Sequence, residues 1–80
     1  MRIDKYLKVS RIIKRRTLAN EACDAGRISV NGNVVKASYD VKIGDVIELR
    51  FGEKISKFEV LAVAEHVTKD GAKEMYRTVN

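Results

Sequence analysis

The feature that most constrains this chain is the stretch GRISVNG, residues 26–32, where a glycine ends a helix-like pattern and an Asn-Gly pair interrupts apolar residues. Gly26 predicts the end of a helix, because glycine adopts the left-handed conformation at no steric cost. Asn31 and Gly32 predict a tight hairpin, because both tolerate a positive φ. The stretch therefore places a helix directly before a two-stranded hairpin.

The first of two helices is predicted over residues 2–9. There Ile3, Tyr6 and Leu7 recur at i, i+3 and i+4, which is the spacing of one helix face. Asp4 lies near the start of this pattern, where a carboxylate can accept a backbone N–H or oppose the positive end of the helix dipole. Capping is therefore favoured for Asp4 over a direct part in binding.

The second helix is predicted after a basic connector, residues 10–16. The connector holds four cations and two isoleucines, which indicates that the apolar pair anchors it to the core while the charges face outward. Thr17 is the candidate N-cap of the helix, and Gly26 marks its end. The apolar stripe predicted to face the core comprises Leu18, Ala19, Ala22 and Ala25.

Two further strands are predicted to form an antiparallel hairpin. Residues 46–51 mostly alternate between apolar and polar side chains, and a Gly-Glu turn leads into a second apolar run over residues 57–63. The aromatic side chains Phe51 and Phe58 are assigned to a small core, because the strands lack the exposed aromatic pair of a base-stacking surface. Base stacking is therefore not expected to dominate any nucleic-acid binding.

The C-terminal residues are predicted to close the domain with a short helix. Helical spacing is shown by Ala72, Met75, Tyr76 and Val79. No internal repeat or linker interrupts the chain, so we expect one α+β domain over residues 1–65, followed by a short extension over residues 66–80.

The positive charge of the chain is concentrated in its first third. Residues 1–27 contain eight basic and three acidic residues, which gives +5, whereas residues 28–80 contain eight of each. A basic block of this kind is typical of a polyanion binder, because each neutralised phosphate releases counterions. A solvated helix face is the alternative, and charge alone does not separate the two.

Residues suited to catalysis are sparse. Cys23 falls within the second predicted helix and is expected to be a buried thiol, and it lies far along the chain from the single histidine, His66. One Cys and one His do not make a zinc site, and no glycine belongs to a phosphate-binding loop. We therefore expect a protein that is not an enzyme and uses no metal or cofactor.

Cysteine usage and hydropathy suggest a cytoplasmic protein. A single cysteine excludes an intramolecular disulfide. No uninterrupted apolar run approaches the roughly 20 residues needed to span a bilayer, so no membrane association is expected. We expect a monomer when the protein is free.

Several spaced motifs resemble the S4 RNA-binding domain. They agree in order and spacing with that family, and they are Arg2-Ile3-Asp4-x-x-Leu7, Arg16-x-x-Ala19, Gly26-Arg27-Ile28-x-Val30-Asn31-Gly32 and Gly44-Asp45-x-Ile47. The resemblance implies an S4 (alpha-L) fold, in which two short N-terminal helices pack on a small, mostly antiparallel sheet. It also implies a basic face that meets ribosomal RNA or tRNA.

More narrowly, the chain resembles the free-standing S4 proteins of ribosome-associated quality control, relatives of the small heat-shock ribosome-recycling S4 proteins. This resemblance implies binding to a large ribosomal subunit obstructed by peptidyl-tRNA, with contacts to rRNA and to P-site tRNA. It also implies a partner protein that directs C-terminal alanine tailing of the stalled chain.

The expected RNA-binding residues have two sources. The resemblance implies that Arg2, Asp4 and Arg16 lie at the RNA interface. Charge and helical spacing add further candidates, namely Lys5, Lys8, Arg11, Lys14, Arg15 and Arg27. The chain departs from many S4 domains at Arg15, because a Ser or Thr usually stands there, so the cap of the second helix is lost or shifted to Thr17.

Other functions remain open from the sequence. One is an accessory protein of ribosome assembly or RNA modification, since S4 domains occur in such proteins. Another is a helix-turn-helix DNA binder, although the connector is longer than the usual turn and the second helix lacks a base-reading array. A protein-interaction surface around Ile47, Leu49 and Phe58 is disfavoured, because those residues are needed for the core.

Overall fold

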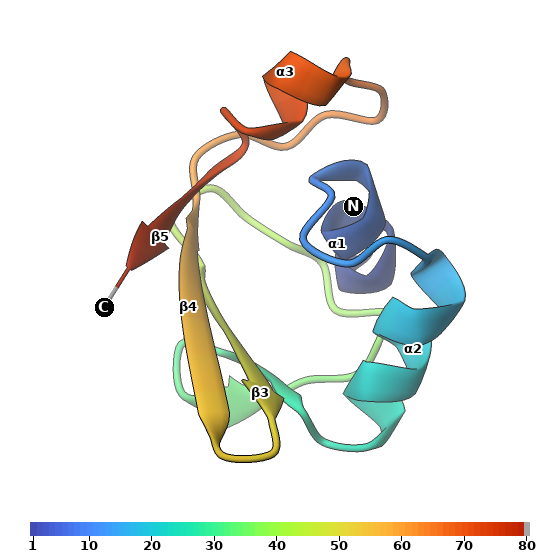
Figure 1. Cartoon of the computed structure of the whole chain (residues 1–80), viewed down its shortest axis with the longest axis vertical. Helices are drawn as coiled ribbons and strands as arrows, with labels where there is room; N and C mark the ends of the chain where they lie inside the picture. Colours follow the sequence, from blue (N-terminus) through green and yellow to red (C-terminus); the bar gives the residue numbers. More distant parts are fainter. Residues whose placement is uncertain (80) are drawn as a thin grey trace.

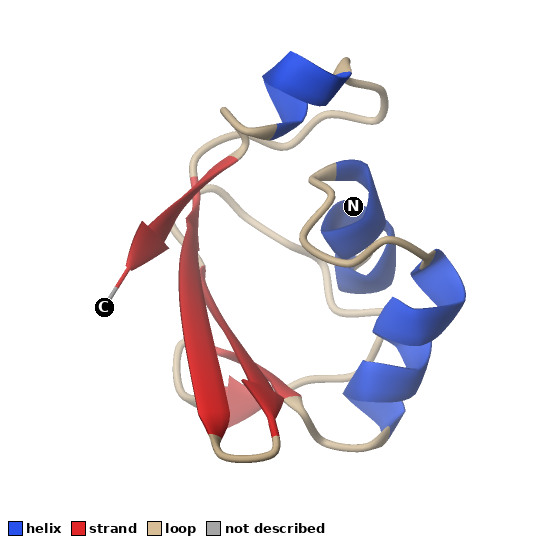
Figure 2. Ribbon diagram, in the orientation of Figure 1, coloured by secondary structure: helices blue, strands red, loops and turns tan. Residues whose placement is uncertain are grey.

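A helical layer packs against one side of an antiparallel sheet in this computed structural model, which describes residues 1–79 (Figures 1 and 2). The elements in chain order are α1 (Ile3–Val9), α2 (Arg16–Asp24), β1 (Ile28–Val30), β2 (Asn33–Val34), β3 (Val46–Phe51), β4 (Lys54–Val60), α3 (Lys69–Ala72) and β5 (Tyr76–Val79). The strand order is β2-β1-β3-β4-β5, and every neighbouring pair is antiparallel. The expected α+β class is confirmed.

The Asn-Gly hairpin forms where the sequence predicts it. Val30 pairs with Asn33 across a two-residue loop, in which φ is 52° at Asn31 and 89° at Gly32. Positive φ at both loop positions is the geometry of a type I′ turn, which matches the twist of the flanking strands. The Asn31 side chain also accepts a hydrogen bond from the backbone N–H of Val46 at 3.0 Å, so the turn is tied to the start of β3.

Helix α1 is the most deeply buried of the helices. Ile3, Tyr6 and Leu7 are fully buried, as the helical spacing predicts. The Tyr6 hydroxyl donates a hydrogen bond to the carbonyl oxygen of Met75 at 2.8 Å, so the N-terminal helix is joined to the C-terminal segment. A seven-residue helix is too short to be stable alone, and this packing holds it in place.

Helix α2 begins without a side-chain cap and ends at a glycine. Its N-cap is Arg15, whose side chain makes no capping hydrogen bond, and Thr17 lies inside the first turn. The prediction that Thr17 caps the helix is therefore wrong. At the other end Gly26 has a φ of 74°, and the N–H of Arg27 bonds to the carbonyl of Ala22 at 2.9 Å. This is the expected glycine-terminated end, in a Schellman arrangement.

The apolar stripe of α2 differs from the predicted one. Ala19, Ala22 and Cys23 are buried, whereas Leu18 is 49% exposed and Ala25 is also exposed. The buried face of α2 comprises positions 19, 22 and 23, and α1 packs against this helix. This face is rotated around the helix axis from the predicted stripe, which included positions 18 and 25. Leu18 consequently faces solvent.

The hairpin of β3 and β4 confirms the predicted antiparallel pair, but its aromatic residues are not equally buried. Phe58 is partly buried and makes an edge-to-face contact with Tyr76 at a centroid distance of 5.3 Å. Phe51, at the end of β3, is 49% exposed, so its assignment to the core is wrong. The strand predicted over 57–63 starts earlier, at Lys54, because the turn at residues 52–53 is tight. It ends at Val60.

The C-terminal segment corrects another prediction. A single helical turn, α3, is capped by the Thr68 side chain, but Tyr76–Val79 form a strand. Val60 pairs with Tyr76 and Lys57 with Val79, so β5 covers the open edge of β4. Satisfying backbone groups along that edge outweighs the helical spacing of residues 72–79.

We expect Arg15→Ser to stabilise the domain by about 1 kcal/mol, because a serine at the N-cap would accept a backbone N–H at the start of α2. The extended backbone of Arg15, with φ −129° and ψ 137°, already suits a capping residue. Urea unfolding measures the gain, and Lys14→Ser is the control, since it removes a neighbouring charge without creating a cap. Equal stabilities of the two variants would contradict the uncapped start of α2.

Candidate nucleic-acid interface

A buried carboxylate organises the surface formed by α1 and α2. Asp4 is 2% exposed, and its oxygens accept hydrogen bonds from two arginines, an asparagine and a backbone N–H. Arg2 donates through Nε and Nη2, each at 3.3 Å. Arg16 lies 3.4 to 3.5 Å away through Nε and Nη2, and Asn20 Nδ2 donates at 3.3 Å. We call Asp4, Arg2, Arg16 and Asn20 the Asp4 cluster.

The Asp4 carboxylate is ionised in this environment. Burial alone would raise its pKa, but hydrogen bonds from Asn20, Arg16 and the Lys5 backbone N–H, together with the Arg16 charge, lower the pKa below its ordinary value. The Lys5 N–H lies 2.8 Å from Oδ1. Asp4 thus accepts a backbone N–H within the first turn of α1, but the N-cap of the helix is Arg2, so Asp4 is not the cap that was predicted. It also anchors side chains of Arg2, Arg16 and Asn20.

The two arginines of the cluster are held at one end and exposed at the other. Their side chains are 50% and 48% exposed, for Arg2 and Arg16 respectively, whereas the Asp4 side chain is 3% exposed. A guanidinium carries five N–H donors, and only some of them are directed at Asp4. The cluster therefore presents two oriented cations to solvent, one at the start of each helix.

Three other predicted residues gather at a second place. Lys8, Arg11 and Lys14 line a hollow of about 380 Å³ together with residues 65–67, and we call this the basic hollow. Lys5 lies between the two sites and forms an ion pair with Glu65.

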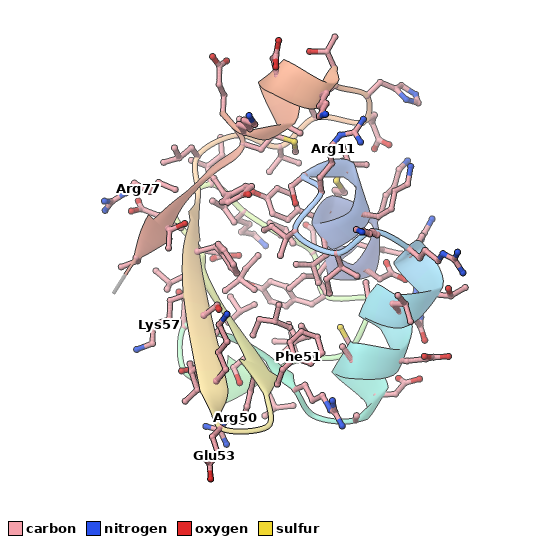
Figure 3. All side chains as sticks on the ribbon, viewed as in Figure 1. Arg11, Arg50, Phe51, Glu53, Lys57 and Arg77 are labelled. Atoms are coloured by element: carbon pink, nitrogen blue, oxygen red, sulfur yellow. The ribbon has the colours of Figure 1, made fainter. Side chains whose placement is uncertain are left out.

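The remaining two predicted residues stand apart. Arg15 is exposed at the N-cap of α2. Arg27 lies beyond the C-terminal end of α2, whereas Arg16 begins the helix, and its guanidinium carbon is 5.9 Å from the centroid of the Phe51 ring. Figure 3 shows Phe51 at the end of β3 near the hairpin turn.

Cys23 is a structural thiol. It is 3% exposed, and burial, with the nearby charges of Asp4 and Asp24, raises its pKa to about 11. A thiol with such a pKa is protonated at neutral pH and is a poor nucleophile. Across residues 1–79, no group of three or more His, Cys, Asp or Glu residues is placed to hold a metal ion, and no helix there is long and apolar enough to cross a membrane.

Sequence reasoning missed three residues of these sites. Asn20 stands four positions after Arg16, so helical periodicity could have placed the two side chains on one face. Glu65 and His66 reach α1 only through the tertiary fold, from the loop between β4 and α3. No local signal in the sequence marks that contact.

Comparison with known proteins gives consistent matches. Residues 1–47 match the S4 domain family model. The "RQC P-site tRNA stabilizing factor" of Halalkalibacterium halodurans is 57% identical over 76 residues, which cover 95% of this chain and 86% of the relative. The protein of the same name from Bacillus subtilis is 55% identical over 76 residues, covering 95% and 88%.

Two solved structures share the fold. The trimeric heat shock protein 15 of Vibrio cholerae superposes with a TM-score of 0.89 at 30% identity, covering 99% of this chain and 81% of that one. The solution structure of the hypothetical protein HP1423 gives 0.84 at 33% identity, covering 100% and 98%. The motifs, the fold and these matches agree that the chain belongs to the S4 domain family.

Proposed function

We propose that this chain is a non-enzymatic RNA-binding factor of ribosome-associated quality control. In this proposal it binds large ribosomal subunits that are obstructed by peptidyl-tRNA and contacts both rRNA and P-site tRNA. The observation that carries the proposal is the exposed arginine pair, Arg2 and Arg16, fixed by Asp4 in the basic third of the chain. Relatives above 50% identity that are named RQC P-site tRNA stabilizing factors support it.

The arginine pair suits structured RNA for a physical reason. Guanidinium groups form paired, charge-assisted hydrogen bonds with phosphate oxygens, and little entropy is lost when the side chains are already oriented. Arg15 and Arg16 also stand at the start of α2, where the helix dipole favours an anion. Contacts of this kind follow backbone shape rather than base sequence, which is how proteins recognise folded RNA.

The proposal extends to the consequence of binding. A factor that holds peptidyl-tRNA in the P site would keep the stalled chain in place while a partner protein directs C-terminal alanine tailing. Within this proposal residues 1–65 form the S4 unit and residues 66–80 a short extension. The protein acts in the cytoplasm and is a monomer when free.

We expect Arg16→Ala to weaken binding to large subunits at least tenfold, because it removes a half-exposed cation. The domain should stay folded, because Arg2, Asn20 and the Lys5 N–H still bind Asp4. A pull-down of the tagged protein from its native cytosol measures the effect, scored for large-subunit rRNA, small-subunit rRNA and tRNA joined to nascent peptide. Arg77→Ala, on β5, is the matched control. Equal recovery of large subunits by both variants would contradict the proposal.

The affinity for RNA should also depend steeply on salt. If about five cations meet phosphates, the logarithm of the binding constant falls against the logarithm of salt concentration with a slope of about −4. Affinity then drops a few hundredfold between about 50 and about 200 mM salt. Binding of purified large subunits, measured across this range, would argue against a phosphate-directed surface if affinity stayed constant.

Asp4→Asn should destabilise the domain by about 2 kcal/mol at neutral pH, because it removes the charge that Arg2 and Arg16 contact. The pKa of Asp4 is lower in the folded state, so its stabilising effect is complete above the ordinary value of 3.8 and is lost as pH falls through the folded pKa. Urea unfolding at several pH values tests this. The gap between wild type and variant should shrink below pH 3.8.

The control for that series is Asp24→Asn, which changes an exposed carboxylate on the same helix layer. It should leave the free energy of unfolding nearly unchanged. If the gap between wild type and Asp4→Asn stayed constant with pH, a buried ionised Asp4 would not be the source of the stabilisation.

A further inference from the structure

The basic hollow combines residues from distant parts of the chain. Lys8 comes from the last turn of α1, and Arg11 and Lys14 come from the connector between α1 and α2. Its opposite wall is the loop that leads from β4 to α3, with His66 and Val67. Figure 3 shows Arg11 beside the end of α1, next to this loop. Residues 65–67 lie beyond the part of the chain that the S4 family model matches.

The charge of the hollow is strongly positive. Lys8, Arg11 and Lys14 each contribute one cation to it. Its only carboxylate among the lining residues, Glu65, is engaged by Lys5, whose ammonium group lies outside the lining. His66 adds a ring that can donate a hydrogen bond. An anion in the hollow would therefore meet several donors and no uncompensated negative charge.

The backbone of Arg11 is strained. Its φ is 64°, in the left-handed region that disfavours side chains other than those of glycine, asparagine and aspartate. Backbone hydrogen bonds on both sides of Arg11 hold the residue in this conformation. The Arg11 N–H donates to the carbonyl of Lys8 at 3.1 Å, and the N–H of Ile13 donates to that of Leu7 at 3.0 Å. Glycine or asparagine would adopt this conformation more readily, so the arginine side chain is present in spite of the backbone.

We propose that the basic hollow binds a phosphate group of the RNA backbone, through Arg11, Lys8 and Lys14 with His66 as a further donor. The proposal rests on the RNA-binding function proposed above and adds a second contact to it. Arg2 and Arg11 stand at opposite ends of α1, which is roughly 10 Å long. The hollow and the Asp4 cluster therefore meet different phosphates.

The proposal gives the segment after β4 a part in binding. The hollow would be open on one side without residues 65–67. The ion pair between Lys5 and Glu65 joins this segment to α1, and the bond from Tyr6 to Met75 secures the chain just beyond α3. The fold thus brings His66 against the cations of α1 and the connector, although the residues next to His66 in the sequence carry no positive charge.

Arg11→Asn tests the proposal, because it should move stability and binding in opposite directions. Asparagine tolerates the left-handed backbone, so the melting temperature should rise by a few degrees. Affinity for purified large ribosomal subunits should fall about threefold to tenfold. The slope of log affinity against log salt should become smaller in magnitude by about one, as expected for one lost phosphate contact.

Two further variants complete the test. Lys14→Gln removes another cation of the hollow without touching the strained residue, and it should weaken binding and reduce the salt slope in the same way. Lys57→Gln removes an exposed cation from β4, labelled in Figure 3 on the far side of the sheet from α1, and should change neither. If both hollow variants matched Lys57→Gln in affinity and slope, the proposal would be overturned.

The source of the phosphate is tested separately. Inorganic pyrophosphate is titrated into the protein while the His66 ring resonances are followed by NMR, and large subunits are then added. Displacement of pyrophosphate by the subunits is expected. If pyrophosphate remained bound beside the subunits, the hollow would be a site for free phosphate compounds and the proposal would be wrong.

Failure of the wider function gives a different pattern. If Arg16→Ala weakened subunit binding while the hollow variants did not, only the hollow would be rejected. If wild type did not bind large subunits at all, the proposed function would fail. The hollow would then be judged on an unrelated RNA duplex, where unchanged binding by Arg11→Asn and Lys14→Gln would reject it too.

Discussion

The buried carboxylate of Asp4 is the interaction on which the exposed helix surface depends. An ionised group at 2% exposure is costly unless its oxygens are fully used, and here two arginines, an amide and a backbone N–H use them. Asp4 joins the start of α1 to the first two turns of α2. The direction of both arginines is therefore set inside the protein before any ligand arrives.

The rest of the fold keeps that cluster in place with very little core. Helix α1 has only seven residues, and its buried side chains contact α2, the sheet and the C-terminal segment. The bond from Tyr6 to Met75 joins α1 to the segment before β5, and the pairing of β5 with β4 fixes that segment on the sheet. In a domain this small, such long-range closure substitutes for core volume.

Local signals in the sequence predicted the elements that local physics decides. The Asn31-Gly32 turn, the glycine end of α2 and the β3–β4 hairpin each follow from a residue that favours one backbone conformation. The errors lie where tertiary contacts decide. Leu18 and Phe51 are apolar residues that the tertiary fold leaves exposed. Residues 76–79 form a strand because an open sheet edge is available.

The sequence likewise predicted the cations of the site but not the contacts that join them. Positive charge in the first third identified the cations, and the S4 resemblance marked Arg2, Asp4 and Arg16. Sequence spacing could not predict that Asp4 binds both Arg2 and Arg16, because that contact depends on the distance between two helices. The hollow lined by Arg11 and His66 was equally hidden, because 55 positions separate those residues in the chain.

We propose that the α1–α2 layer, with its fixed arginine pair, is the face that meets RNA. A cryo-electron microscopy structure of the protein on a large ribosomal subunit carrying peptidyl-tRNA tests this most directly. We expect Arg2 and Arg16 to lie against RNA phosphates, while Lys57 and Arg77 of the sheet face away. RNA packed on the sheet, with the α1–α2 layer exposed to solvent, would contradict it.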